Sequence, residues 1–345
     1  MASEVVKYLL LLFAFSFSLL LSYFINKIII KIEKKRDIHQ QIHRLIVSTH
    51  KKKKKKDTPT LGGIAIFLSI ILITSIFNFN FFQSKKGIFI TILFTSYFFV
   101  GLVDDLKKLK DKNESGLPPL VRIGFEIAFA LCGLLVLGYD QKTSWIINFP
   151  FDIGYINLNF LTPLFLIFII VGSANASNLV DGLDGLSAGI TTIALSPFIF
   201  FSFFKGDFIL MTFLITVIGS LLGFVLLNLY PASIFMGDCG SLMLGAILGS
   251  IAICLYRIPE LALIGGIYVI ECASVIVQVS YYKAFKKRVF LMAPLHHHFE
   301  LKGWGETKVV MFYYLIGVIF AVFGTIIGLR IWIFCYLDMV RQINF

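Results

Sequence analysis

Residues 208–229 read FILMTFLITVIGSLLGFVLLNL and contain no charged side chain. An α-helix of about 20 apolar residues crosses the hydrocarbon core of a bilayer, because each residue adds about 1.5 Å. Nine further runs have this character, and the ten runs are 5–31, 61–80, 88–106, 119–138, 158–177, 184–204, 208–229, 240–257, 261–283 and 309–336. The pattern predicts an all-α, polytopic membrane protein with about ten transmembrane helices, forming one integral membrane domain over residues 1–345.

The composition excludes several other classes of protein. Hydrophobic residues make up 58% of the 345 residues and charged residues 15%, whereas soluble domains carry about 25% charge. A soluble enzyme, a disordered chain and a secreted disulfide scaffold are therefore excluded. The cysteines are odd in number and show no paired metal-ligand spacing, so we interpret them as small apolar packing residues. They are Cys132, Cys239, Cys254, Cys272 and Cys335.

The basic residues predict the topology. Of the 31 lysines and arginines, 21 follow the first, third and ninth apolar runs. Because basic residues accumulate on the cytoplasmic side, we expect both termini outside, on the periplasmic side. Residues 32–60 then form a basic cytoplasmic loop, which contains Lys51 to Lys56. We interpret this loop as solvated beside anionic lipid, because it lacks the interleaved aromatic residues of a nucleic-acid site.

Four polar motifs follow runs three, five, seven and nine, so the charge count places them all at the cytoplasmic face. They are Val103 to Lys108, Asn175 to Gly185, Asn228 to Ser241, and Ala293 to Glu300. A transporter more often carries its ionisable groups near the middle of the bilayer. Clustering at one face therefore indicates chemistry on a water-soluble substrate at the cytoplasmic surface.

The acidic motifs suit magnesium and phosphate. Carboxylates such as Asp104 and Asp105 bind the hard cation, and Lys108 suits phosphate as a point charge. Taken alone, the Asp pair is more often a charge cluster at the membrane boundary, and Asp238 is better explained as a helix cap. Polar residues recur every third position from Asn175 to Asp184, and the glycines there predict a broken or re-entrant segment lining a polar cavity.

The histidine motif is His296-His297-His298. Consecutive side chains point in three directions on a helix, so they make a poor tetrahedral zinc set. They fit better as donors to phosphate or as proton carriers. An exposed polar turn is the alternative explanation.

Together the motifs resemble the polyprenyl-phosphate N-acetylhexosamine-1-phosphate transferase superfamily. The resemblance rests on six strings in order: Thr58 to Gly63, Val103 to Asp105, Asn175 to Gly185, Phe235 to Ser241, Ser274 to Gln278 and Ala293 to Trp304. The last string is similar to the branch that acts on phospho-MurNAc-pentapeptide. This resemblance implies a multi-pass enzyme of the bacterial cytoplasmic membrane that transfers the group from UDP-MurNAc-pentapeptide to undecaprenyl phosphate, giving lipid I and UMP.

The resemblance also implies the roles of individual residues. The expected catalytic residues are Asp104, Asp105, Asp238 and His297, and the three aspartates are the expected Mg²⁺ ligands. The expected substrate-binding residues are Lys108, Asn175, Asn178, Asp181, Asp184, Asn228, Phe235, Gln278, His296 and His298. The expected partners are the two substrates and membrane lipids. A homodimer is compatible with this interpretation, and no nucleic-acid partner is expected.

The chain departs from the family pattern at a few positions. Asp57 stands where a glycine is usual, and Cys239 where a threonine is frequent. Family lysines near Gly116 are missing, and Arg122 is the candidate replacement. Two alternatives stay open: a sister transferase that uses UDP-GlcNAc, and an anionic-metabolite transporter. The triple histidine argues against the first, and the one-sided carboxylates with no internal repeat argue against the second.

The predicted topology can be tested with single cysteine probes in a background without the native cysteines. Asp57→Cys and Glu300→Cys should be protected from a membrane-impermeant thiol reagent added outside, whereas Asp140→Cys and Lys205→Cys should react. Labelling of the position-57 probe from outside would overturn the topology and the shared cytoplasmic face.

Overall fold

The computed structural model describes residues 2–36, 58–111, 116–138, 146–148 and 155–343. The probe positions Asp57 and Asp140, and most of the basic loop 32–60, lie outside the described residues.

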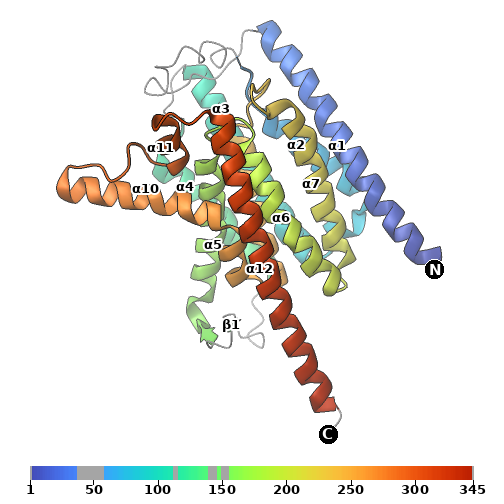
Figure 1. Ribbon diagram of the computed structural model, residues 1–345. Helices are drawn as coiled ribbons and strands as arrows, with labels where there is room; N and C mark the ends of the chain where they lie inside the picture. Colours follow the sequence, from blue (N-terminus) through green and yellow to red (C-terminus); the bar gives the residue numbers. More distant parts are fainter. Residues whose placement is uncertain (1, 37–57, 112–115, 139–145, 149–154, 344–345) are drawn as a thin grey trace.

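Helices dominate the described chain, as predicted (Figure 1). The α-helices are α1 (Ala2–Arg36), α2 (Gly62–Phe77), α3 (Lys85–Asp111), α4 (Pro119–Leu137), α5 (Thr162–Val180), α6 (Leu186–Phe204), α7 (Phe208–Asn228), α8 (Asp238–Leu255), α9 (Ile258–Ile264), α10 (Gly266–Phe285), α11 (Leu295–Leu301) and α12 (Glu306–Ile343). Two short 3₁₀ helices, η3 (Phe79–Gln83) and η5 (Asn159–Leu161), complete the helical elements. The strands β1 (Ile146–Asn148) and β2 (Tyr155–Asn157) pair antiparallel, and the sequence did not predict them.

The predicted spans all correspond to helical segments. Among the described residues, eight helices are long and apolar enough to cross a membrane. Helices α9 and α10 are apolar enough to cross a membrane when taken together, but the pair is bent by 77°. Helix α2 is apolar but has only 16 residues, and it matches the remaining predicted run. The polytopic all-α architecture is therefore confirmed, and the side on which each terminus lies stays a prediction.

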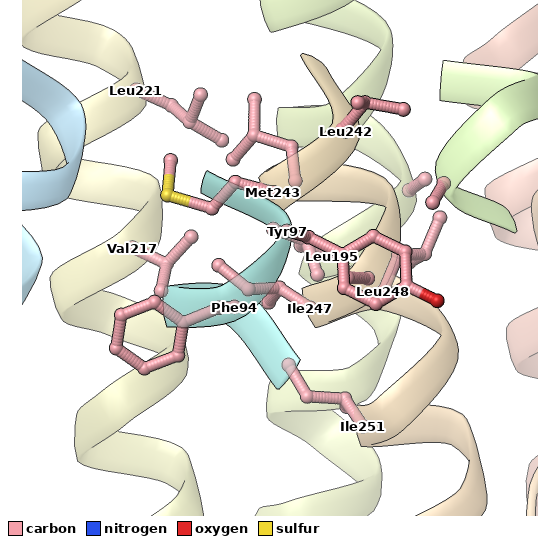
Figure 2. Close-up of a cluster of buried hydrophobic side chains, with 14 of the residues drawn as sticks. Phe94, Tyr97, Leu195, Val217, Leu221, Leu242, Met243, Ile247, Leu248 and Ile251 are labelled. Atoms are coloured by element: carbon pink, nitrogen blue, oxygen red, sulfur yellow. The ribbon is translucent and has the colours of Figure 1, made fainter. Parts of the chain in front are cut away.

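Helix α8 lies at the centre of the bundle. Every residue from Cys239 to Leu255 is buried. Figure 2 shows its apolar side chains among those of three neighbouring helices, α3, α6 and α7. The labelled residues are Phe94, Tyr97, Leu195, Val217, Leu221, Leu242, Met243, Ile247, Leu248 and Ile251. This core fixes the beginning of α8, where Asp238 stands.

Helix α5 packs against α8 through a small residue. A Cβ atom at Gly245 would lie 2.3 Å from the carbonyl oxygen of Ser173 and 2.5 Å from the Cα atom of Ala174. In lipid, helices associate mainly through close packing, and small residues let the backbones approach. Gly245 therefore sets the distance between α5 and α8, and with it the distance between the polar residues at their ends.

Helix α10 leaves the bundle. Figure 1 shows it running outward after the bend from α9, and the chain then returns through α11 beside α12. Its apolar side chains Val269, Ile276 and Phe285 are exposed. The sequence predicted one continuous span over 261–283, so the bend is a difference that hydropathy alone does not reveal.

The α5–α8 contact gives a test of the packing. Gly245→Ala should lower the unfolding temperature of the detergent-solubilised protein, because overpacking a filled interface costs about 1–3 kcal/mol. Gly172→Ala is the matched control on α5, since a Cβ atom there meets nothing within 4 Å. Equal unfolding temperatures for the two variants would contradict this contact.

Candidate active site

The ends of α3 and α8 meet at Asp105. Its carboxylate accepts hydrogen bonds from the backbone N–H groups of Asp238 (3.0 Å) and Cys239 (2.9 Å). The first N–H groups of a helix have no partner within the helix and favour negative charge. The α3 backbone comes close because Gly101 has no side chain: a Cβ atom there would lie 2.3 Å from the carbonyl oxygen of Asp238. Asp105 therefore holds the backbone of Asp238 in place.

The Asp238 side chain points toward other helices and does not cap α8. Its Oδ1 atom accepts a hydrogen bond from Asn178 Nδ2 at 2.8 Å. Its Oδ2 atom lies 2.8 Å from Lys108 Nζ and 3.6 Å from Arg122 Nη1. The cap that Asp238 alone suggested is wrong, because Asp238 is the first residue of α8 and Gly237 occupies the cap position.

Lys108 joins two carboxylates. Its Nζ atom lies 2.6 Å from Asp104 Oδ2, one helical turn earlier, and 2.8 Å from Asp238 Oδ2. Asp104 also accepts a hydrogen bond from the backbone N–H of Leu117 at 2.6 Å. The i,i+4 pairing predicted on α3 is thus present, and Lys108 extends it to α8.

Helix α4 contributes two residues beside this cluster. Arg122 donates to Asn175 Oδ1 at 3.0 Å, and Asn175 Nδ2 donates to Glu126 Oε2 at 2.5 Å. Glu126 is fully buried. Arg122, the candidate replacement for the missing lysines, therefore lies at the site. Glu126 was missed, although an acidic residue inside an apolar run is a signal for a partnered polar position.

The predicted break in the second polar motif, Asn175 to Gly185, is confined to residues 181–185. Helix α5 runs unbroken through Asn175 and Asn178 to Val180. Asp184 Oδ2 accepts from the N–H of Ala232 at 3.0 Å, and Asn228 Oδ1 accepts from the N–H of Gly185 at 3.0 Å. These two side chains tie the turn to the segment before α8.

Asp181 begins this turn and carries an altered acidity. Burial, together with the negative charges of Asp238 and Asp105, raises the pKa of its carboxyl to about 8. The carboxyl is therefore mostly protonated at pH 7, and a cation bound nearby would favour its ionised form.

Backbone hydrogen bonds from the Thr58 to Gly63 string also hold the segment before Asp238. The N–H of Phe235 donates to the carbonyl oxygen of Pro59, and the N–H of Gly62 donates to that of Phe235, at 2.8 and 2.9 Å. Glu33 Oε2 accepts from the N–H of Thr60 at 2.8 Å. Glu33 was also missed, and its signal is a lone acid in the basic end of α1. The Thr58 to Gly63 string therefore acts on the site through backbone contacts.

The three histidine side chains have different polar partners, as their spacing predicted, although the rings of His296 and His297 lie 4.2 Å apart. His297 Nδ1 lies 2.8 Å from Glu300 Oε2. His298 Nδ1 accepts from the N–H of Leu291 at 3.1 Å, and the His296 side chain is fully buried. The exposed-turn alternative is wrong, because His296 and His297 are buried within α11.

Gln278 was expected in a nucleoside pocket. Its Oε1 atom accepts from the N–H groups of Val289 (3.0 Å) and Phe290 (2.9 Å), and its Nε2 atom donates to the carbonyl oxygen of Phe290 at 3.1 Å. Gln278 therefore holds the segment between α10 and α11.

The cluster fits a divalent cation that arrives with a phosphate ligand. The carboxyl groups of Asp104, Asp105, Asp181 and Asp238 outnumber the cationic groups of Lys108 and Arg122, and a bound divalent cation would favour the ionised form of these carboxyls. Among the described residues, no group of three His, Cys, Asp or Glu side chains is arranged as a preformed metal cage. Magnesium is usually held by one or two carboxylates together with waters and substrate phosphates, so a complete protein cage is not required.

Comparison with known proteins gives a consistent set of relatives. The family model described as glycosyl transferase family 4 matches residues 87–256. The chain is 39% identical to the phospho-N-acetylmuramoyl-pentapeptide-transferase of Staphylococcus haemolyticus, over 91% of this chain and 98% of that protein. It is 39% identical to the protein of that name from a Geobacillus species, over 81% and 86%, and 41% identical to that from Rickettsia prowazekii, over 79% and 80%.

Proposed function

The chain belongs to the phospho-N-acetylmuramoyl-pentapeptide-transferase family, and from that premise we propose that it transfers phospho-MurNAc-pentapeptide from its UDP carrier to undecaprenyl phosphate. The products are lipid I and UMP, formed in the bacterial cytoplasmic membrane. The observation that carries the proposal is the Asp238 carboxylate, which shares Lys108 with Asp104 and lies 3.6 Å from Arg122. This mixed cluster suits a reaction that brings two anions together.

Magnesium would be held by Asp238 and Asp104, whose oxygens face the same ammonium group. When bound, the ion offsets the charge of the diphosphate and of the departing UMP. Both oxygens of Asp105 already accept backbone N–H groups. We therefore assign Asp105 to holding Asp238 and to the charge of the site, rather than to a direct metal bond.

Lys108 and Arg122 would bind the phosphates. The ammonium group acts as a point charge, whereas a guanidinium can contact two phosphate oxygens at once. Asn178 orients the Asp238 carboxylate, and Asn175 orients Arg122. The nearby Asp181 and Asp184 belong to the turn that would receive the nucleotide.

The chemical step is a direct displacement. An oxygen of the lipid phosphate attacks the phosphorus attached to the sugar, the bond from that phosphorus to the bridging oxygen breaks, and UMP leaves with the electron pair. Phosphoryl transfer depends mainly on positioning and electrostatic stabilisation. Asp104 contacts Lys108 and the N–H of Leu117, which favours a role in holding ions over one as a covalent nucleophile.

His297 would act on the phosphate side of the same site. Its Nδ1 atom lies 2.8 Å from Glu300 Oε2, and this contact fixes the ring orientation. An oriented imidazole donates a hydrogen bond to phosphate or carries a proton near neutral pH. The segment Pro294 to Trp304 also carries Glu300 and Lys302, which offer contacts for the muramyl-peptide part of the substrate.

The role of Asp238 can be tested by charge removal. Asp238→Asn preserves shape but removes the charge that a hard cation needs, so turnover should be almost completely lost while the protein stays folded. Chelation should abolish wild-type turnover, and added Mg²⁺ should restore it. Cys239→Thr is the neighbouring control and should stay close to wild type. Substantial activity of Asp238→Asn at saturating Mg²⁺ would remove Asp238 from the metal site.

The choice of sugar nucleotide can be tested with purified protein and radiolabelled donors. UDP-MurNAc-pentapeptide and undecaprenyl phosphate should give a lipid-linked product and UMP, whereas UDP-GlcNAc should give little, because polar groups built for one substrate stay unpaired with the other. His297→Ala should lower turnover strongly without changing the unfolding temperature. Turnover of UDP-GlcNAc alone would assign the chain to the sister transferase.

A further inference from the structure

A buried carboxylate on α10 holds the beginning of the histidine helix. Glu271 is fully buried. Its Oε2 atom accepts from the N–H of Leu295 at 2.7 Å, and its Oε1 atom accepts from the N–H of His296 at 3.1 Å. These N–H groups stand at the start of α11, where they have no partner within the helix. The position of α11 is therefore fixed from α10 through one side chain.

The same carboxylate also faces the His296 ring. His296 Nδ1 lies 3.4 Å from Glu271 Oε2, and the His296 side chain is fully buried. Burial lowers the pKa of this imidazole, which favours its neutral form. Because neither ring nitrogen is accessible to solvent, a substrate does not reach them in this arrangement.

The far side of the ring lies against the Asp181–Gly185 turn. A Cβ atom at Gly182 would be only 2.2 Å from His296 Nε2, so the ring occupies the space that any other residue at 182 would need. Gly182 directly follows Asp181. The turn is held on its other side by Asn228 Oδ1 through the N–H of Gly185 and by Glu306 Oε1 through the N–H of Asp184.

We propose that Glu271 and His296 are a pair of positioning residues that set the place of the Asp181–Gly185 turn, without touching the substrate. Glu271 contacts both the backbone N–H and the ring of His296. The His296 ring then determines how closely the turn approaches α11. This proposal rests on the proposed function, because the turn is where the UDP substrate would bind. It also changes the expected role of His296 from substrate binding to support of Asp181 and Asp184.

The ring contact can be tested by a clash and its relief. Gly182→Ala should lower kcat/KM for the UDP substrate about 100-fold, since misplacement by about 1 Å can cost that much. His296→Ala should have a smaller effect. The double variant should recover about ten-fold over Gly182→Ala alone, because the smaller side chain makes room for the new methyl group. Gly172→Ala, which has open space, is the matched control.

A double variant no more active than Gly182→Ala would overturn the ring contact. The same four variants are compared by thermal unfolding in detergent, where relief of the clash should also restore the unfolding temperature. This second measurement needs no turnover. If the unaltered protein forms no lipid product, the proposed function fails, while the unfolding temperatures still decide whether His296 and Gly182 are coupled.

The Glu271 contact is tested by Glu271→Gln, which places an amide NH₂ group opposite a backbone N–H donor. KM for the UDP substrate should rise about ten-fold, with KM for undecaprenyl phosphate unchanged, because only the turn is displaced. Glu271→Asp, which keeps the charge, should recover part of the loss. Equal KM values for Glu271→Gln and wild type, with only a lower yield of folded protein, would reduce Glu271 to a structural residue.

Discussion

The structure depends on one buried interaction, the Asp105 carboxylate against the first N–H groups of α8. It satisfies helix donors that water cannot reach in a packed membrane protein. Because α8 is also the most enclosed helix of the bundle, the same contact connects the apolar core to the polar site. The position of Asp238 is therefore determined by the core, and the charged groups around it come from α3, α4 and α5.

The site is assembled from groups that are costly to bury alone and acceptable in combination. A buried charge requires partners, and here each partner belongs to a different helix: Lys108 to α3, Arg122 to α4 and Asn178 to α5. The carboxyl groups of the cluster outnumber its cationic groups. This composition suits a divalent cation, which would favour the ionised carboxyls and offset the charge of a phosphate ligand.

The sequence predicted the helices and most of the site, for physical reasons that can be named. Apolar runs must become helices in lipid because every backbone group needs a partner, so α1 to α8 and α12 follow from hydropathy. The bend between α9 and α10 has no such signal, since Gly265 and Gly266 lie inside an apolar run. Asp104, Asp238 and Lys108 were found together because their motifs carry charge. Glu33, Glu126 and Glu271 were missed because each is a single acid whose partner is distant in sequence.

The close approaches at Gly101, Gly182 and Gly245 have a consequence for how such a protein can change over generations. At each position the neighbouring atoms already occupy the space of the next smallest side chain, so a substitution there displaces backbone at Gly101 and Gly245 and the His296 ring at Gly182. These close contacts thus offer few viable intermediates to natural selection. New substrate preferences or insensitivity to an inhibitor would have to arise at the periphery, where side chains such as His298 and Lys302 can be exchanged one at a time.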